Sequence, residues 1–282
     1  MAKKLQFSAP DEQALYENAL NTINLASKIP FVKVDRAEFL KKQFEGSPYL
    51  EEILEHGPQA VFSQATLRKH AQKVVASNTT KTAAVSFASG IPTNVLVMIP
   101  AGAADVVQYF GFAMRMAQQI AYLYGEDELF ESNGTSDLSD EAKIRVMAYL
   151  GGMFGAAGAA ALIINTSQKV GTQVGKKVAG KALTKTVWYP LLKKTGTMLG
   201  AKITKKTVEK TITKAVPVLG GAVSGGIAWA SFKPMGKRLI DVFERQLNGE
   251  FDDIDELLPE FADKLESKSA NPPVIDGEVV SE

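Results

Sequence analysis

Two stretches of this 282-residue chain carry no charge and are rich in glycine and alanine, and they constrain the fold more than any other feature. They run from Val146 to Ser167 and from Ala215 to Phe232. In both, small residues recur every four positions, a spacing that lets a second helix backbone approach closely. That packing offsets the cost of about 1 kcal/mol that an interior helical glycine carries relative to alanine. We predict two glycine-zipper helices, whose packing glycines are Gly151, Gly155, Gly221 and Gly225.

Helix start and stop signals punctuate the rest of the chain. Asp35 followed by Glu38 resembles a capping box, and Gly57-Pro58 is a stop signal. Ser139 or Ser136 caps the helix that enters the first uncharged stretch. No segment shows the period-two alternation of a strand. We therefore expect an all-α protein with a single compact helical domain over residues 10–266, a flexible N-terminus at 1–9 and a disordered acidic tail at 267–282.

A third uncharged run, from Thr82 to Ala104, is interrupted by glycine and by two prolines, Pro92 and Pro100. Proline inside a helix removes a hydrogen bond and kinks the axis, so this run predicts a broken element and not one straight helix. Asp105 then opens a helix that closes at Gly125. We interpret Asp105 as a helix cap in preference to a buried catalytic acid.

Charge is divided unevenly along a chain whose net charge is only +1. The segment from Gln168 to Lys214 contains twelve lysines and one acid, Glu209. The segment from Glu250 to Glu282 contains eleven acids and two lysines, and its first part reads as an amphipathic acidic helix.

The basic segment has three interpretations: a membrane-contact surface, a nucleic-acid surface, or a solvated face that balances the acidic end. Lysine-rich helices with interfacial aromatics suit an anionic lipid surface. Nucleic-acid readout and stacking usually use arginine and repeated aromatics, which are scarce here, so this partner is disfavoured. The candidate lipid-contact residues are Lys176, Lys177, Trp188, Tyr189, Lys193, Lys194, Lys205 and Lys206.

The uncharged stretches leave two alternatives open. Val146 to Ile164 is 19 residues without charge, which is just long enough to span a bilayer. Its hydrophobicity is diluted by glycine and alanine, so the same residues could form the buried core of a soluble bundle. A chain poised between these states would be amphitropic, soluble until a bilayer favours insertion.

No set of residues indicates a reaction. The chain has no cysteine, and its two histidines, His56 and His70, lack the spacing of metal ligands and are expected on helix surfaces. We expect no catalytic residues, no metal and no cofactor. The N-terminus has no apolar run typical of a signal peptide, which predicts a cytoplasmic protein.

Two groups of residues resemble a known family. Ile99-Pro100-Ala101-Gly102-Ala103-Ala104-Asp105, with Gln118 to Gly125 after it, and later Ala215 to Gly226, resemble the motifs of EcsC-family proteins. The family's usual asparagine near the last glycines is replaced here by Ile227-Ala228-Trp229. The resemblance implies a bacterial helical protein near membranes, with no established catalytic residues, in envelope stress or phage defence.

These observations predict a non-enzymatic, amphitropic protein that contacts or inserts into anionic bilayers at the inner membrane. The alternative is a soluble scaffold that binds protein partners, or a second copy of itself, through the acidic C-terminal helix. A hydrolase centred on Asp105 is the third hypothesis.

Overall fold

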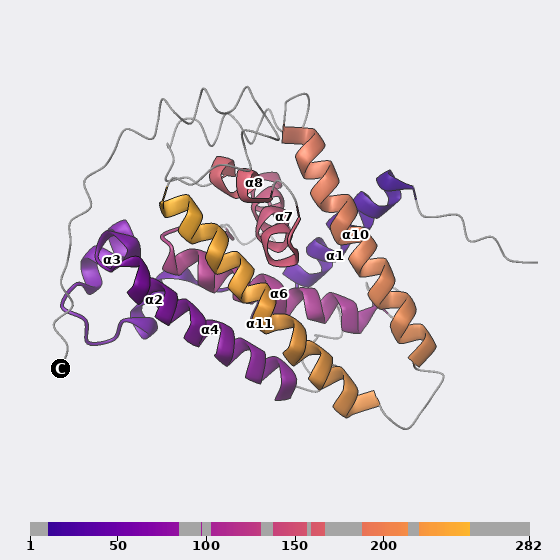
Figure 1. The fold of residues 1–282 in the computed structure, drawn as a ribbon, viewed down its shortest axis with the longest axis horizontal. Coiled ribbons are helices and arrows are strands. Elements are labelled where there is room, and N and C mark those ends of the chain that lie inside the picture. The colour runs from indigo at the N-terminus through magenta and orange to yellow at the C-terminus, as the bar shows by residue number, and fades with distance from the viewer. Residues whose placement is uncertain are drawn as a thin grey trace, which may run out of the picture.

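The computed structural model describes residues 11–84, Val97, 103–130, 138–156, 159–166, 188–213 and 220–248. Helices and the turns that join them make up this part of the chain, which contains no strand, so the all-α prediction is confirmed (Figure 1). The elements are α1 (Glu12–Ser27), η1 (Pro30–Val32), α2 (Arg36–Gln43), α3 (Leu50–His56), η2 (Pro58–Ala60), α4 (Gln64–Ala84), α6 (Ala104–Leu123), α7 (Asp140–Phe154), α8 (Ala159–Thr166), α10 (Trp188–Thr213) and α11 (Gly220–Leu247).

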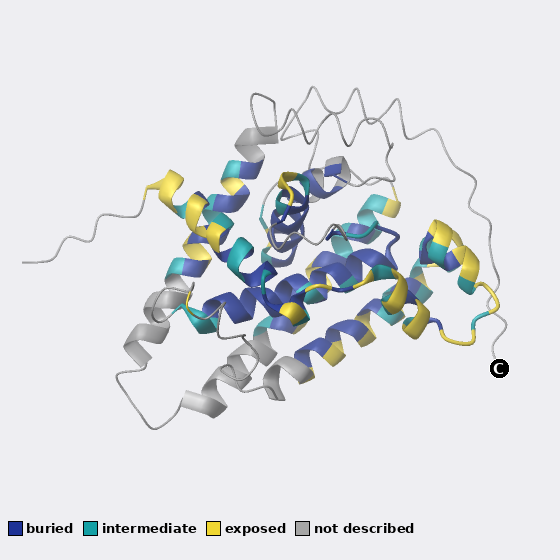
Figure 2. Cartoon of the chain, turned by 180° about the vertical axis from the view of Figure 1, so that it is seen from behind, coloured by how far each residue is buried: buried dark blue, intermediate teal, exposed yellow. Residues whose placement is uncertain are grey.

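Helix α6 lies at the centre and is surrounded by α1, α4, α7 and α11. From Val106 to Leu123 every residue is buried except Arg115 and Gln119. Figure 2 shows the same contrast, with the interior helices buried along much of their length and exposed residues concentrated at the periphery. Burying one large apolar side chain stabilises a fold by about 1.5–3 kcal/mol, so the surroundings of α6 dominate the folding free energy.

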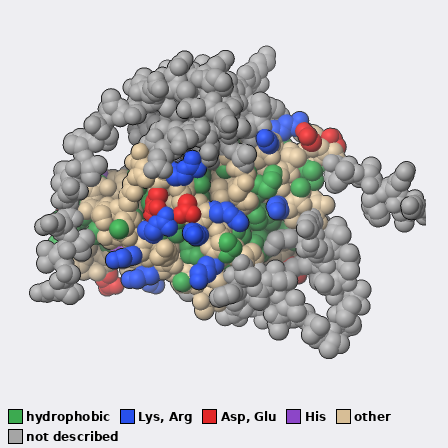
Figure 3. All heavy atoms as spheres, viewed as in Figure 1, with side chains coloured by type: hydrophobic (Ala, Val, Ile, Leu, Met, Phe, Trp, Pro, Cys, Tyr) green, Lys and Arg blue, Asp and Glu red, His purple; other side chains and the backbone are tan. Residues whose placement is uncertain are grey.

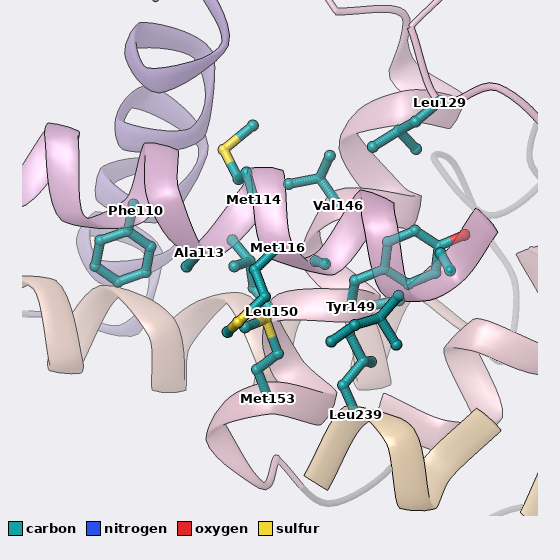
Figure 4. Close-up of a cluster of buried hydrophobic side chains, with 14 of the residues drawn as sticks. Phe110, Ala113, Met114, Met116, Leu129, Val146, Tyr149, Leu150, Met153 and Leu239 are labelled. Atoms are coloured by element: carbon teal, nitrogen blue, oxygen red, sulfur yellow. The ribbon is translucent and has the colours of Figure 1, made fainter. Parts of the chain in front are cut away.

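Side chains from three helices meet in this core. Ala113 and Met116 of α6 lie beside Leu150 and Met153 of α7, and Leu239 of α11 approaches from below (Figure 4). Aromatic rings extend the contact, because Phe110 of α6 stacks on Phe154 of α7 and Tyr109 packs edge-on against Phe232 of α11. The core is therefore one continuous cluster and not a set of separate helix pairs.

Several predicted helix ends are confirmed. The Asp35 carboxylate accepts a hydrogen bond of 2.7 Å from the Glu38 backbone N–H, and the Ser139 hydroxyl accepts one of 3.2 Å from Ala142 N–H. Gly57 ends α3 with a φ of 86°. Asp105 lies in the first turn of α6, whose N-cap is Ala103, so its assignment as the cap residue was wrong by two positions.

The first uncharged stretch does not form one glycine-zipper helix. Helix α7 ends at Phe154, and Gly155 is its C-cap with a φ of 75° in the left-handed region. A Cβ on Gly155 would come no closer than 3.8 Å to its nearest neighbour, the Arg238 side chain, so its predicted packing role is wrong. The left-handed conformation that glycine permits ends the helix here, and α8 begins afresh at Ala159.

Gly151 lies close to α10, because a Cβ there would lie 2.6 Å from Thr195 Cγ2. Gly221 and Gly225 lie within α11. Their side-chain surroundings are outside the part of the chain that the structure describes, so their packing role stays a prediction.

A different glycine pair, Gly196 and Gly200 of α10, lies at a close contact between two helices. A Cβ on Gly200 would lie 1.9 Å from the Leu15 carbonyl oxygen of α1, and one on Gly196 would lie 2.4 Å from Tyr16 Cδ2. These glycines are four residues apart, the spacing that places two small residues on one helix face. The backbones of α1 and α10 therefore meet at a contact that only glycine fits.

Gly200→Ala should destabilise the fold by at least about 2 kcal/mol, because the added methyl group would collide with backbone atoms that cannot rotate away. The matched control is Gly152→Ala in α7, where the new Cβ would meet only the side-chain tips of Leu239 and Ile163 at 3.3 and 3.4 Å. Its free energy of unfolding should change by less than about 1 kcal/mol, since helix propensity favours alanine. Denaturant unfolding measures both, and equal effects would contradict the assigned contact.

Candidate functional site

Helices α4 and α11 lie side by side and antiparallel on the face seen in Figure 1. They approach closely at Gly236 of α11, where a Cβ would lie 2.4 Å from Val75 Cγ2 of α4. Their inner faces carry buried residues such as Leu67, Ala71 and Phe243. Both helices are thus fixed to the core, and their outer faces form one continuous surface.

That outer surface is strongly basic. Helix α4 contains four cations and no Asp or Glu. Exposed cations from the two helices occur at four-residue spacing, which places each pair on one side of its helix. Figure 3 shows Lys and Arg side chains gathered over α4, α11 and α10 on this side of the molecule. We define the basic face as the exposed residues Lys69, Lys73, Lys233, Lys237 and Arg238.

Arg68 of α4 forms ion pairs with two acids of α11. Its Nε donates to Glu244 Oε1 at 2.7 Å and its Nη2 to Asp241 Oδ1 at 2.7 Å. Hydrogen bonding to Glu244, followed by that to Asp241, raises the pKa of the Arg68 guanidinium further above its ordinary value. The Tyr124 hydroxyl donates to Glu244 Oε1 at 3.1 Å, and burial with the nearby carboxylate raises the pKa of Tyr124.

These pairs also decide the charge of the surface. Asp241 and Glu244 are the acids of α11, and both are held by Arg68. Within the described residues, no carboxylate forms an ion pair with any member of the basic face. The basic face therefore keeps its positive charge for an external anion.

The predicted lysine-rich site is only partly within the described residues. Lys193 is half-buried and Lys194 is exposed, both near the start of α10. Trp188, Tyr189, Lys205 and Lys206 belong to α10, but their side chains lie outside the described part, as do Lys176 and Lys177 entirely. Sequence reasoning missed the basic face, although the absence of acids from residues 64–84 was a signal for it.

Acids outnumber the cations Arg36, Lys41 and Lys42 over α2, α3 and the turn between them, although α2 itself carries more cations than acids. Five exposed glutamates lie there, and we call them the acidic pole: Glu38, Glu45, Glu51, Glu52 and Glu55. The molecule therefore has a basic side and an acidic end, which gives it an electrostatic preference for one orientation near a charged surface.

The histidines do not indicate a metal site. His56 is exposed beside Glu52 and Glu55, at 3.8 Å from each. His70 is half-buried and not on the surface as predicted: its ring lies 4.9 Å from that of Phe44, and its Nδ1 accepts a hydrogen bond of 2.8 Å from Gln43 Nε2. Burial, then the charge of Lys73, lowers the pKa of His70. No group of three potential ligands occurs among the described residues.

One cluster of ionisable side chains is buried inside the protein. Glu126 Oε2 lies 3.3 Å from Arg145 Nη2 and accepts a hydrogen bond of 3.1 Å from the Tyr149 hydroxyl. The side chains of Arg145 and Glu126 are each 3% exposed, and burial raises the pKa of Tyr149. Arg145 also donates to the carbonyl oxygens of Asp127 and Glu128 at 3.0 and 3.2 Å. The cluster ties the segment after α6 to α7, which is a structural role.

Comparisons with family models, curated proteins and solved structures found no match to this chain.

Arg145→Met should lower the free energy of unfolding by about 3–5 kcal/mol, because it leaves Glu126 buried without its cation. Arg68→Met provides the comparison. Arg68 is one-third exposed and its partners can be solvated, so its loss should cost about 1 kcal/mol or less. Chemical denaturation measures both values, and a cost for Arg145→Met no larger than that for Arg68→Met would contradict the structural role.

Proposed function

We propose that this protein is a non-enzymatic peripheral membrane protein that binds anionic bilayers through its basic face. The observation that carries the proposal is the arrangement of Lys69, Lys73, Lys233, Lys237 and Arg238: all five are exposed, on two packed helices whose acids, Asp241 and Glu244, are both paired with Arg68. An anionic lipid surface offers many negative headgroups to such an array at once.

The magnitude is sufficient for reversible binding. A basic residue near an anionic membrane surface contributes about 1 kcal/mol, so the basic face together with exposed lysines of α10 gives several kcal/mol. Bound this way, the protein would be released by salt, because the Debye length shortens to about 3 Å at 1 M ionic strength.

Attachment at the surface is the mode that the described residues favour. The large apolar side chains exposed among them are Tyr49, Val97 and Leu247, none of which belongs to the basic face. Among the helices described, none combines the length and apolar character needed to cross a bilayer.

A nucleic acid is the main competing polyanion. Four of the five residues of the basic face are lysines, whereas nucleic-acid recognition commonly uses arginine and stacking aromatic side chains. The resemblance to EcsC-family proteins supports a setting at the cytoplasmic side of the inner membrane, and we propose envelope stress or phage defence as the context. A soluble scaffold that uses the acidic C-terminal segment is the second candidate.

Replacing Lys69, Lys73, Lys233 and Lys237 together by Gln should weaken binding to anionic vesicles at least about tenfold, because each loses roughly 1 kcal/mol of attraction. The matched control replaces the same four residues by Arg, which preserves their charge and should retain binding. Co-sedimentation with vesicles of phosphatidylglycerol and phosphatidylcholine, at low and high salt, measures the partition.

Equal partition of the Gln and Arg variants would refute the basic face as the contact surface. Equal binding to purely zwitterionic vesicles would refute the electrostatic mechanism. A preference for duplex DNA over anionic vesicles, in a direct competition at one ionic strength, would favour the nucleic-acid alternative.

A further inference from the structure

Helix α11 ends at Leu247, and the acidic segment follows it directly in the sequence. Residues 250–266 contain eight acids and one lysine: Glu250, Asp252, Asp253, Asp255, Glu256, Glu260, Asp263 and Glu266, with Lys264. The sequence predicts an amphipathic helix there, with Leu257, Leu258, Phe261 and Leu265 on one side. This segment lies outside the described residues, which end just before it at Asn248.

The acidic segment starts beside the basic face. Gln64, the first residue of α4, donates through its side-chain amide to the side chain of Asn248. The segment therefore begins where α4 begins and α11 ends, next to both helices that carry the basic face. Lys233 is fifteen residues back along α11, about 22 Å at the rise of a helix.

The length of the segment matches that distance. Residues 250–266 span about 24 Å as a helix and more than twice that when extended. A single reversal of direction after Asn248 would lay the acids along α4 and α11. Because the segment is joined to α11, its effective concentration at the basic face is on the order of millimolar, so even weak ion pairs hold it there.

We propose that residues 250–266 occupy the basic face in the absence of lipid and must be displaced before the protein binds a membrane. This contact rests on the proposed function, because it assigns the regulation of the same surface. Opposite charge is the basis of recognition. Exposed ion pairs are individually weak, so a dense array of anionic headgroups competes effectively with the segment. The protein would thus bind only membranes whose anionic charge exceeds a threshold.

The test uses the full chain with five acids neutralised: Asp252→Asn, Asp253→Asn, Asp255→Asn, Glu256→Gln and Glu260→Gln. A matched control neutralises the acidic pole instead, with Gln at positions 38, 45, 51, 52 and 55, and so changes the net charge equally outside the acidic segment. The first variant should bind anionic vesicles about tenfold more tightly than the native chain at low salt, and more tightly than the control.

A second measurement is made without lipid. Carbodiimide cross-linking of the native monomer, mapped by mass spectrometry, should join carboxylates of residues 250–266 to Lys69, Lys73, Lys233 or Lys237. Links through Glu250, Asp263 and Glu266, which remain carboxylates in the first variant, should be lost there and persist in the control. The absence of such links within the monomer, or equal vesicle affinity of the two variants, would overturn the proposal. Links found only in dimers would identify a second copy as the occupant.

The two measurements separate this inference from the proposed function. If no form of the chain binds vesicles, membrane binding fails while the cross-links still decide whether the acidic segment covers the basic face. If vesicles bind all forms equally, membrane binding stands and the regulatory contact fails.

Discussion

Helix α6 is buried on almost every side, and this constraint organises the rest of the structure. In a helix with so little exposed surface, a polar side chain is stabilised by hydrogen bonds inside the protein. Gln118 does this by donating to the Val32 carbonyl at 2.8 Å and accepting from Val34 N–H at 3.1 Å, and Tyr122 donates to the Val34 carbonyl at 3.2 Å. The segment after α1 is therefore pinned across the side of α6, which fixes where α2 and α3 begin.

A core this apolar confines most charge to the periphery, and a cation inside it is stable only with polar partners around it. Arg145 enters the interior only with Glu126, Tyr149 and two carbonyl oxygens around it. The other charged residues lie mostly on the outer helices. Among these, α4 and α11 have apolar inner faces and basic outer faces. The acidic pole on α2 and α3 and the basic face are consequences of the same division, since neither could be placed against α6.

The sequence predicted what depends on neighbouring residues and missed what depends on distant ones. Asp35 and Ser139 could be identified as caps because capping is decided within four residues. Gly155 was mistaken for a packing residue because glycine serves a helix interior and a helix end equally well, and only the fold selects between them. The basic face joins residues 160 or more positions apart, such as Lys73 and Lys233, so the absence of acids from residues 64–84 could indicate only one half of it. The four-residue spacing of Gly196 and Gly200 is visible in the sequence, but the lysines around them favoured an interpretation by charge.

The packing of α7 and α11 also distinguishes two modes of membrane binding, which are insertion into the bilayer and attachment to its surface. Inserting α7 into a bilayer would carry Arg145 with it and separate Tyr149 from Phe243, whose rings lie 5.7 Å apart. It would also expose the apolar surface of α6 to water, at a cost of about 1.5–3 kcal/mol for each large side chain uncovered. Binding through the basic face requires no such rearrangement, because its cations already point outward from helices that remain packed. Insertion would need a compensating source of free energy, whereas surface attachment needs only the removal of whatever anion occupies the face.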